Sequence, residues 1–252
     1  MLDEAAISQV IIESFSQKLI AHLRNDVVIV GGGPSGLVLG ERLARAGFRT
    51  ALFESRLATG GGVWGGGMLM NQIVLQEEGM AIAREYGIRG TEHRPGYWAV
   101  DAVAMTAKLT AAAVDAGLVI FNGIEAEDVA VKNDRVDGIV INWSLVRTST
   151  LPVDPLLVQS RITVDSTGHP SAVVNMLASR GIIPPARGEA PMNCEAGERM
   201  TVEHTGCVYP GLYVTGMAAC GYHGSSRMGP IFGGMLLSGV KAAEAITREL
   251  RP

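Results

Sequence analysis

The sequence predicts an α/β fold, in which a mostly parallel sheet carries helices and an antiparallel β-meander is inserted in the second half of the chain. Three observations lead to this class. Short apolar runs at 26–30 and 50–54, bounded by glycine or polar residues, are typical of buried parallel strands. Between them, residues 37–46 have the apolar spacing of a helix. Residues 126–142 alternate in polarity around an Asn-Asp pair, which indicates a β-hairpin.

The remaining elements follow from the same patterns in chain order. Residues 5–23 space their apolar side chains like an amphipathic helix. Further helices are expected at 71–87, 101–116 and 233–250, and further strands at 118–121, 157–166 and 212–215. No long linker or repeat divides the chain, so we expect one α/β domain over 1–252. Its parts are an N-terminal helix at 5–23, a core at 26–121 and 157–252, and a β-meander insert at about 124–156.

Composition excludes several classes of protein. With 47% hydrophobic and 18% charged residues among 252, the chain has enough apolar material for a core and is not intrinsically disordered. A net charge of −4 argues against nucleic-acid binding and against a basic membrane patch. No apolar run reaches the roughly 18 residues of a membrane-spanning helix, and Asp3 and Glu4 are acidic where a signal peptide is basic. We expect a cytoplasmic protein.

The three cysteines are an odd number without CxxC spacing, which supports neither a disulfide framework nor a zinc site. They are expected to be small core residues.

A glycine-rich loop follows the first strand directly. Residues 31–36 (GGGPSG) fit the pattern G-x-G-x-x-G between a strand and a helix. Gly31 permits a tight turn, Gly33 lets the backbone approach a pyrophosphate, and Gly36 allows close helix–strand packing. Glu54, at the end of the next strand, is placed to accept hydrogen bonds from ribose hydroxyls. A turn without a ligand is the alternative, but strand, helix and acid in register favour a Rossmann-like dinucleotide-binding fold.

The architecture resembles the flavoprotein fold of the glutathione-reductase type. Arg56 followed by Gly61 and Gly62 is similar to the second glycine signature of that group. Those flavoproteins end their last strand with a Gly-Asp pair, whereas here Met217 occupies the place of the acid. Methionine cannot accept hydrogen bonds from a ribityl chain in the way a carboxylate does, so NAD is favoured over FAD. A small FAD-dependent oxidoreductase and a non-catalytic NAD-binding module remain as alternatives.

Three stretches together resemble the thiamine thiazole synthase family. They are residues 60–69 (GGGVWGGGML), 165–169 (DSTGH) and 227–235 (RMGPIFGGM), and the resemblance extends from about residue 10 to 250. The family builds the ADP-thiazole precursor of thiamine from NAD, glycine and sulfur. The resemblance therefore implies that NAD is a consumed substrate rather than a redox cofactor, and that the enzyme is a glycosyl-transferring transferase. It also implies a homo-oligomer, since the family generally forms rings of subunits, often octamers.

The resemblance implies an iron site. The family's Fe(II) ligands correspond to Asp154 and His169, with the aspartate reaching the site from a neighbouring subunit. Imidazole and carboxylate together suit Fe(II) and leave positions open for other ligands. Without the resemblance, an Asp-Pro pair is typical of a turn and a lone histidine is usually structural. Arg227 is the third expected catalytic residue, because a guanidinium can hold the carboxylate of glycine through two hydrogen bonds.

The sulfur source differs from that of the relatives. Some family members sacrifice a cysteine two positions before the metal-binding aspartate, and sulfide-using members carry histidine there, whereas this chain has Pro152. We therefore expect a multi-turnover enzyme that takes free sulfide. The nucleotide contacts implied by the motif and by the resemblance are Gly31, Gly33, Ser35, Gly36, Glu54, Ser55, Gly62, Ala126, Pro152, Val153 and Met217.

Overall fold

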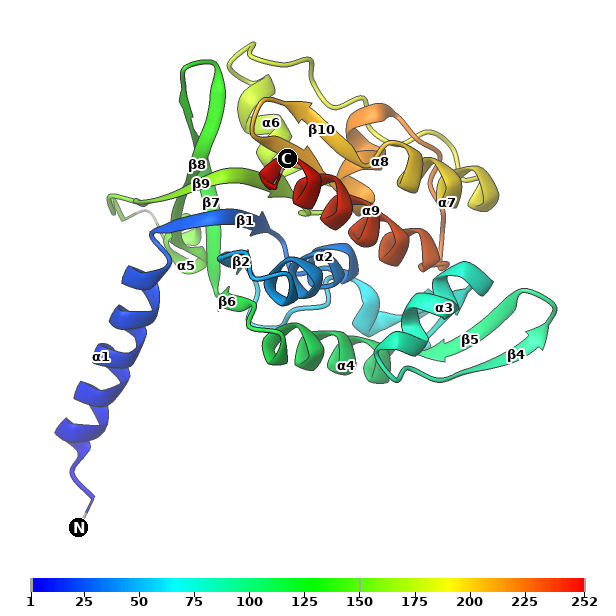
Figure 1. Cartoon of the computed structure of the whole chain (residues 1–252), viewed down its shortest axis with the longest axis horizontal. Helices are drawn as coiled ribbons and strands as arrows, with labels where there is room; N and C mark the ends of the chain where they lie inside the picture. Colours follow the sequence, from blue (N-terminus) through cyan, green and yellow to red (C-terminus); the bar gives the residue numbers. More distant parts are fainter. Residues whose placement is uncertain (1, 150, 252) are drawn as a thin grey trace.

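A sheet of eight strands forms the centre of the computed structural model, which describes residues 2–149 and 151–251. The strand order along its main path is β10–β11–β9–β1–β2–β6 (Figure 1). From β11 to β6 neighbouring strands are parallel, and β10 is antiparallel to β11. The bounds are β1 (Arg24–Val30), β2 (Thr50–Glu54), β6 (Val119–Asn122), β9 (Leu156–Asp165), β10 (Gly206–Tyr209) and β11 (Leu212–Val214). The predicted α/β class with a parallel core is confirmed.

Strand β1 is buried on both faces because successive side chains point to opposite sides of the sheet. Val27 and Ile29 belong to a core cluster shared with the helices α2 (Pro34–Arg45), α4 (Ala102–Asp115) and α9 (Gly233–Leu250). Val28 and Val30 belong to a second cluster, shared with α6 (Ala172–Ala178) and with β7 and β8. The run of aliphatic residues in β1 therefore has a layer on each side, as a parallel strand requires.

The predicted antiparallel meander is confirmed. Strand β7 (Ile124–Lys132) pairs with β8 (Arg135–Trp143), and the turn between them has positive φ at Asn133 and Asp134, the conformation that matches the twist of a hairpin. Strand β8 then pairs with the first half of β9. Strand β9 thus begins in the meander and ends in the parallel sheet. The short helix α5 (Ser144–Thr148) lies in the connection between β8 and β9.

The helix predicted over 71–87 is wrong in its first part. Residues Gln72–Leu75 form strand β3, and the helix α3 occupies only Glu77–Glu85. Strand β3 pairs with β5 (Tyr97–Asp101), which pairs with β4 (Gly90–Arg94), in a separate three-stranded sheet. Tertiary pairing decides this segment, because the backbone of Val74 also bonds to Pro230 and Phe232 from a distant part of the chain.

Helices α7 (Cys194–Glu203) and α8 (Gly216–His223) precede α9 and were not predicted. The expectation that all three cysteines belong to the core is also wrong. Cys220, on α8, is fully buried, whereas Cys194 and Cys207 are exposed.

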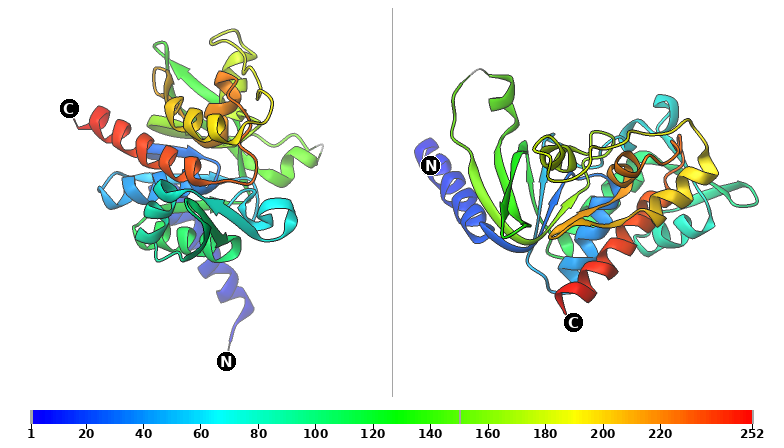
Figure 2. Two further views of the ribbon diagram at one scale, coloured as in Figure 1. Left: turned by 90° about the vertical axis from the view of Figure 1, so that its right-hand side faces the viewer. Right: turned by 90° about the horizontal axis from the view of Figure 1, so that it is seen from above.

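The N-terminal helix α1 (Glu4–Ala21) matches the predicted helix at 5–23 and projects from the rest of the molecule (Figure 1). It lies at the opposite end from the small sheet of β3, β4 and β5 (Figure 2). None of its residues is buried. Its exposed large apolar side chains are Ile7, Val10, Ile11, Ile12, Phe15 and Ile20. Over residues 2–149 and 151–251, no helix is both long and apolar enough to cross a membrane.

Candidate functional site

The glycine-rich loop connects the end of β1 to the start of α2. Gly31 has φ +100° and donates its backbone N–H to Phe53 O at 2.8 Å, which ties the loop to β2. A Cβ on Gly36 would lie 2.4 Å from Gly31 O and 2.9 Å from Ser166 Oγ, so this position must be glycine for helix and loop to pack. A Cβ on Gly33 would meet nothing within 4 Å. The backbone at the N-terminus of α2 is therefore open to a ligand.

A second glycine-rich segment lies against the first. Gly60 donates its N–H to Gly32 O at 2.6 Å, and a Cβ on Gly61 would lie 3.4 Å from Gly33 Cα. Gly62 is exposed and has open space where a side chain would be. Two stretches of bare backbone thus face each other at the carboxyl end of the sheet. An open α/β sheet binds its ligand at this end.

Glu54 lies beside both glycine segments at the end of β2. Its side chain is buried, with Oε2 accepting a hydrogen bond from the N–H of Gly32 at 2.8 Å and Oε1 accepting one from Arg56 at 2.9 Å. Ser55 is exposed, and its hydroxyl lies 3.4 Å from Glu54 Oε1. The acid that the motif predicted at the ribose position therefore also holds the loop in shape.

A buried group of hydroxyls supports the start of α2. Ser35 Oγ lies 3.0 Å from Ser166 Oγ, and Thr215 Oγ1 lies 3.1 Å from Ser166 Oγ and 3.4 Å from Ser35 Oγ. These side chains come from α2 and from the ends of β9 and β11. Sequence reasoning identified Ser35 and missed the other two, which belong to no local motif. Met217 packs with Cys220, Met228 and Met235 in a small apolar cluster next to this group.

Asp154 and His169 are not brought together within one chain. They lie beyond opposite ends of β9, whose ten residues span about 30 Å at the usual rise per residue. In the part of the chain that the structure describes, no group of three or more His, Cys, Asp or Glu side chains could hold a metal ion. A site that used both residues would need two copies of the chain.

The segment before β9 places Pro152, Val153 and Asp154 on the surface. The side-chain amide of Asn142 donates to Val153 O at 3.2 Å and is the described polar contact that holds this segment to β8. Ala126, on β7, is half-buried and pairs with Ile141. These residues lie toward the meander, away from the end of β9 that carries His169.

His169 follows the carboxyl end of β9. Its side chain is 56% exposed, and its Nδ1 lies 2.9 Å from Oε1 of Glu189, whose side chain is only 17% exposed. Sequence reasoning missed Glu189, because it lies in an irregular segment between α6 and α7 that has neither periodicity nor a motif. The contact is visible only in three dimensions.

Arg227 lies in the loop between α8 and α9. Its backbone N–H donates to Ala190 O at 3.2 Å, and its carbonyl accepts from Asn193 at 3.0 Å, so the main chain is fixed on both sides. The side chain is exposed, and within residues 2–149 and 151–251 no hydrogen bond or ion pair engages the guanidinium. It is available for an anionic group such as a carboxylate.

Two buried acids stabilise the surrounding elements. Asp165 accepts hydrogen bonds from the N–H groups of Thr167 and Val174, both at 3.0 Å, and burial raises the pKa of its carboxyl group. Glu198, on α7, accepts from Gln76 Nε2 and, at 2.6 Å, from the N–H of Gly234 at the start of α9. Burial raises the pKa of Glu198 as well.

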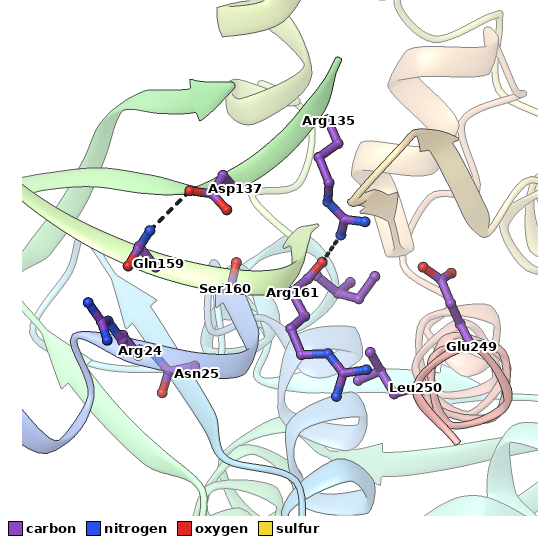
Figure 3. A pocket seen from close by; sticks show the side chains of 10 residues that line it. Arg24, Asn25, Arg135, Asp137, Gln159, Ser160, Arg161, Glu249 and Leu250 are labelled. Atoms are coloured by element: carbon purple, nitrogen blue, oxygen red, sulfur yellow. Dashed lines mark hydrogen bonds between the residues drawn. The ribbon is translucent and has the colours of Figure 1, made fainter. Parts of the chain in front are cut away.

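A cavity of about 450 Å³ lies elsewhere, at the amino end of β1 (Figure 3). Arg24, Arg135 and Arg161 line it together with the acids Asp137 and Glu249. Ligands of open α/β sheets bind at the carboxyl ends of the strands, so this cavity is separate from the candidate site.

Comparison with known proteins identifies the family. The family model described as "Thi4 family" matches residues 8–232. A curated relative, thiamine thiazole synthase of Pyrococcus furiosus, is 50% identical over 250 residues, which cover 99% of each chain. The crystal structure of Thermovibrio ammonificans THI4 aligns with a TM-score of 0.97 at 48% identity, covering 100% of this chain and 99% of that one.

More distant structures share the fold alone. BexE, described as acting in oxidation during BE-7585A biosynthesis, aligns with a TM-score of 0.50 at 20% identity over 66% of this chain and 36% of that one. The predicted fold, with its likeness to FAD-dependent oxidoreductases and its small antiparallel insertion, is confirmed. The match over almost the full length, together with the twin glycine segments, shows that the chain belongs to the Thi4 family.

Proposed function

We propose that this protein makes the ADP-thiazole precursor of thiamine from NAD, glycine and free sulfide, with release of nicotinamide and with the help of Fe(II). One observation carries the proposal: a dinucleotide cradle of two facing glycine segments and Glu54 is combined with Met217 at the place where flavoproteins of this fold have an acid. The names of the curated relatives support the same activity.

The cradle is suited to the ADP part of NAD. Backbone N–H groups at the N-terminus of α2 attract the pyrophosphate, and the open space at Gly33 and Gly62 lets the phosphates approach the main chain. Glu54 accepts from the ribose hydroxyls, with Ser55 beside it. Ser35 is held at the phosphate turn by Ser166. Ala126, Pro152, Val153 and Met217 complete the proposed nucleotide contacts.

The iron site uses His169 of one subunit and Asp154 of another. The donor set fits Fe(II), because imidazole nitrogen and carboxylate oxygen are ligands that this ion accepts. His169 is more than half exposed at the carboxyl edge of the sheet, so its ring can reach a ligand there. When bound, Fe(II) would act as a Lewis acid that polarises the substrate and orients sulfide.

Exposed apolar residues surround Asp154, which supports its position at a subunit contact. They are Trp143, Leu151, Val153, Leu156 and Leu157. Contiguous apolar surface of this kind is typical of protein–protein interfaces. The unburied helix α1 adds further apolar surface at the same end of the molecule (Figure 1). We therefore propose a homo-oligomer in which the exposed segment that carries Asp154 meets the His169 edge of a second copy.

Arg227 and the sulfur source complete the proposal. The exposed guanidinium of Arg227 would hold the carboxylate of glycine and of the intermediates derived from it. Pro152 offers no sulfur, and Cys220, on α8, is fully buried with its thiol 2.9 Å from Thr201 Oγ1. Free sulfide is therefore the proposed donor, and no side chain is consumed.

Anaerobic incubation with NAD, glycine, sulfide and Fe(II) tests the activity. We expect release of nicotinamide and formation of an adenylated thiazole, both detected by mass spectrometry. Asp154→Ala and His169→Ala should abolish the thiazole while leaving NAD affinity largely intact. A flavin spectrum of the purified protein would favour the oxidoreductase alternative, and intact NAD after incubation would favour a non-catalytic module.

A further inference from the structure

We infer that Glu189 is a positioning residue, which holds the His169 ring so that Nε2 faces the metal. The inference deepens the proposed function and depends on its assignment of His169 as an iron ligand. It starts from the 2.9 Å contact between Glu189 Oε1 and His169 Nδ1, which joins an exposed imidazole to a largely buried carboxylate.

The carboxylate of Glu189 is otherwise unpartnered at this oxygen. Across the described ranges 2–149 and 151–251, Glu189 Oε1 is buried without a hydrogen bond of good alignment. Leaving a carboxylate oxygen buried and unpaired costs free energy, so a donor should be found for it. The imidazole of His169 is at hydrogen-bond distance, and because it is mostly exposed its ring can rotate to align the N–H.

The main chain holds Glu189 firmly on both sides. Gly188 donates its N–H to Gly221 O at 2.9 Å, and Ala190 donates to Ser225 O at 3.0 Å. Both acceptors belong to the segment that runs from the end of α8 toward Arg227. The other partner is fixed as well, because a Cβ on Gly221 would lie 2.7 Å from Ser171 Oγ, two residues after His169. The carboxylate thus has a fixed position relative to the imidazole.

A carboxylate in this position selects one form of the histidine. When Nδ1 carries the hydrogen and donates it to Glu189, the lone pair is left on Nε2. Metal-binding histidines usually donate their second ring nitrogen to a carboxylate or carbonyl in this way, and loss of the acceptor weakens metal binding by about 10–100-fold. Glu189 would therefore act on the iron through His169, without touching it.

Anaerobic equilibrium dialysis of Fe(II) against the metal-free protein tests the inference. The variants are Glu189→Ala, Glu189→Gln and His169→Ala, with Glu244→Gln, an exposed acid in the middle of α9, as the matched control. We expect Glu189→Ala to weaken Fe(II) binding by about 10–100-fold. Glu189→Gln should fall between it and the wild type, because its amide oxygen still accepts from Nδ1. NAD affinity and the denaturation midpoint, measured on the same samples, should not change.

The outcomes separate this inference from the proposed function. If His169→Ala binds Fe(II) as well as the wild type does, the proposed iron ligand is wrong and the role of Glu189 is overturned with it. If His169→Ala loses Fe(II) while Glu189→Ala and Glu189→Gln bind like the wild type, the inference alone is overturned. It is also overturned if Glu189→Ala loses binding as completely as His169→Ala, which would make Glu189 a ligand. Finally, Glu189→Ala combined with His169→Ala should add no further loss.

Discussion

The carboxylate of Glu54 accepts a hydrogen bond from the backbone N–H of Gly32 at 2.8 Å, which fastens the end of β2 to the glycine-rich loop. The second oxygen accepts from Arg56, so one buried side chain stabilises both the first loop and the start of the second. The acid predicted to bind ribose therefore has a structural role before any ligand arrives. A substitution at Glu54 should affect both stability and NAD binding.

Glu54→Ala should lower the free energy of unfolding by about 1–3 kcal/mol, because two backbone N–H groups lose a charged acceptor. The affinity for NAD should fall at least about tenfold, or about 1.4 kcal/mol. Chemical denaturation and isothermal titration with NAD measure the two effects. Glu54→Gln keeps one acceptor oxygen and should give smaller losses. Unchanged NAD affinity in both variants would show that Glu54 does not contact the nucleotide.

Gly36→Ala and Gly33→Ala form a matched pair of glycine substitutions in the same loop. The Cβ at residue 36 would meet Gly31 O at 2.4 Å, so this change should destabilise the fold by about 2 kcal/mol or more. Gly33 has φ −70° and free space, so alanine there should leave stability within about 0.5 kcal/mol of the wild type.

Binding should discriminate between the two positions as well. The methyl group of Gly33→Ala would project where the pyrophosphate approaches, so NAD affinity should fall by about tenfold without a loss of stability. Thermal denaturation and NAD titration of the purified variants measure both effects. Equal loss of stability in the two variants would contradict the described loop packing.

Local patterns were sufficient to predict the nucleotide-binding half of the fold. Strand, glycine loop, helix and acid lie within residues 26–54, so their spacing is readable along the sequence. The segment at 72–75 was misread as helix because its strand exists only through pairing with β5 and with residues near Pro230. A periodicity argument cannot detect partners that are far away in the chain.

The iron site shows the same limit. Asp154 and His169 were identified through family resemblance, and the structure places them beyond opposite ends of β9. Glu189 was missed because its contact with His169 depends on how the irregular segment between α6 and α7 folds back onto α8. Sequence spacing carries no trace of that contact.

Mixing two inactive variants tests whether the site is shared between subunits. Asp154→Ala and His169→Ala should each be inactive as homo-oligomers. When both are co-expressed in one assembly, about a quarter of the sites should receive an intact residue of each kind and recover activity. Thiazole formation by purified mixed assemblies is the measurement. No recovery in verified mixed assemblies would show that the two residues do not act across a subunit contact.

Glu198 should make stability depend on pH. Burial raises the pKa of its carboxyl group above the ordinary 4.5, so the folded chain holds this proton to higher pH than the unfolded chain does. The stabilising contribution is complete below the unfolded value and is lost as pH rises through the folded pKa.

Glu198→Gln stays neutral and can still accept hydrogen bonds from Gln76 and Gly234. Its free energy of unfolding relative to the wild type should therefore increase as pH rises from below the ordinary pKa of glutamate to above neutrality. Urea denaturation at a series of pH values, at one protein concentration, measures this difference. Parallel curves for the two proteins would contradict a raised pKa at Glu198.

The central claim is that NAD is consumed and that sulfur comes from free sulfide. Anaerobic turnover with NAD, glycine, Fe(II) and ³⁴S-labelled sulfide tests it most directly, with mass spectrometry of the small molecules and of the intact protein. We predict labelled adenylated thiazole in excess of one equivalent per subunit and a protein of unchanged mass. Unlabelled thiazole at no more than one equivalent, with a protein lighter by the loss of one sulfur, would contradict the account.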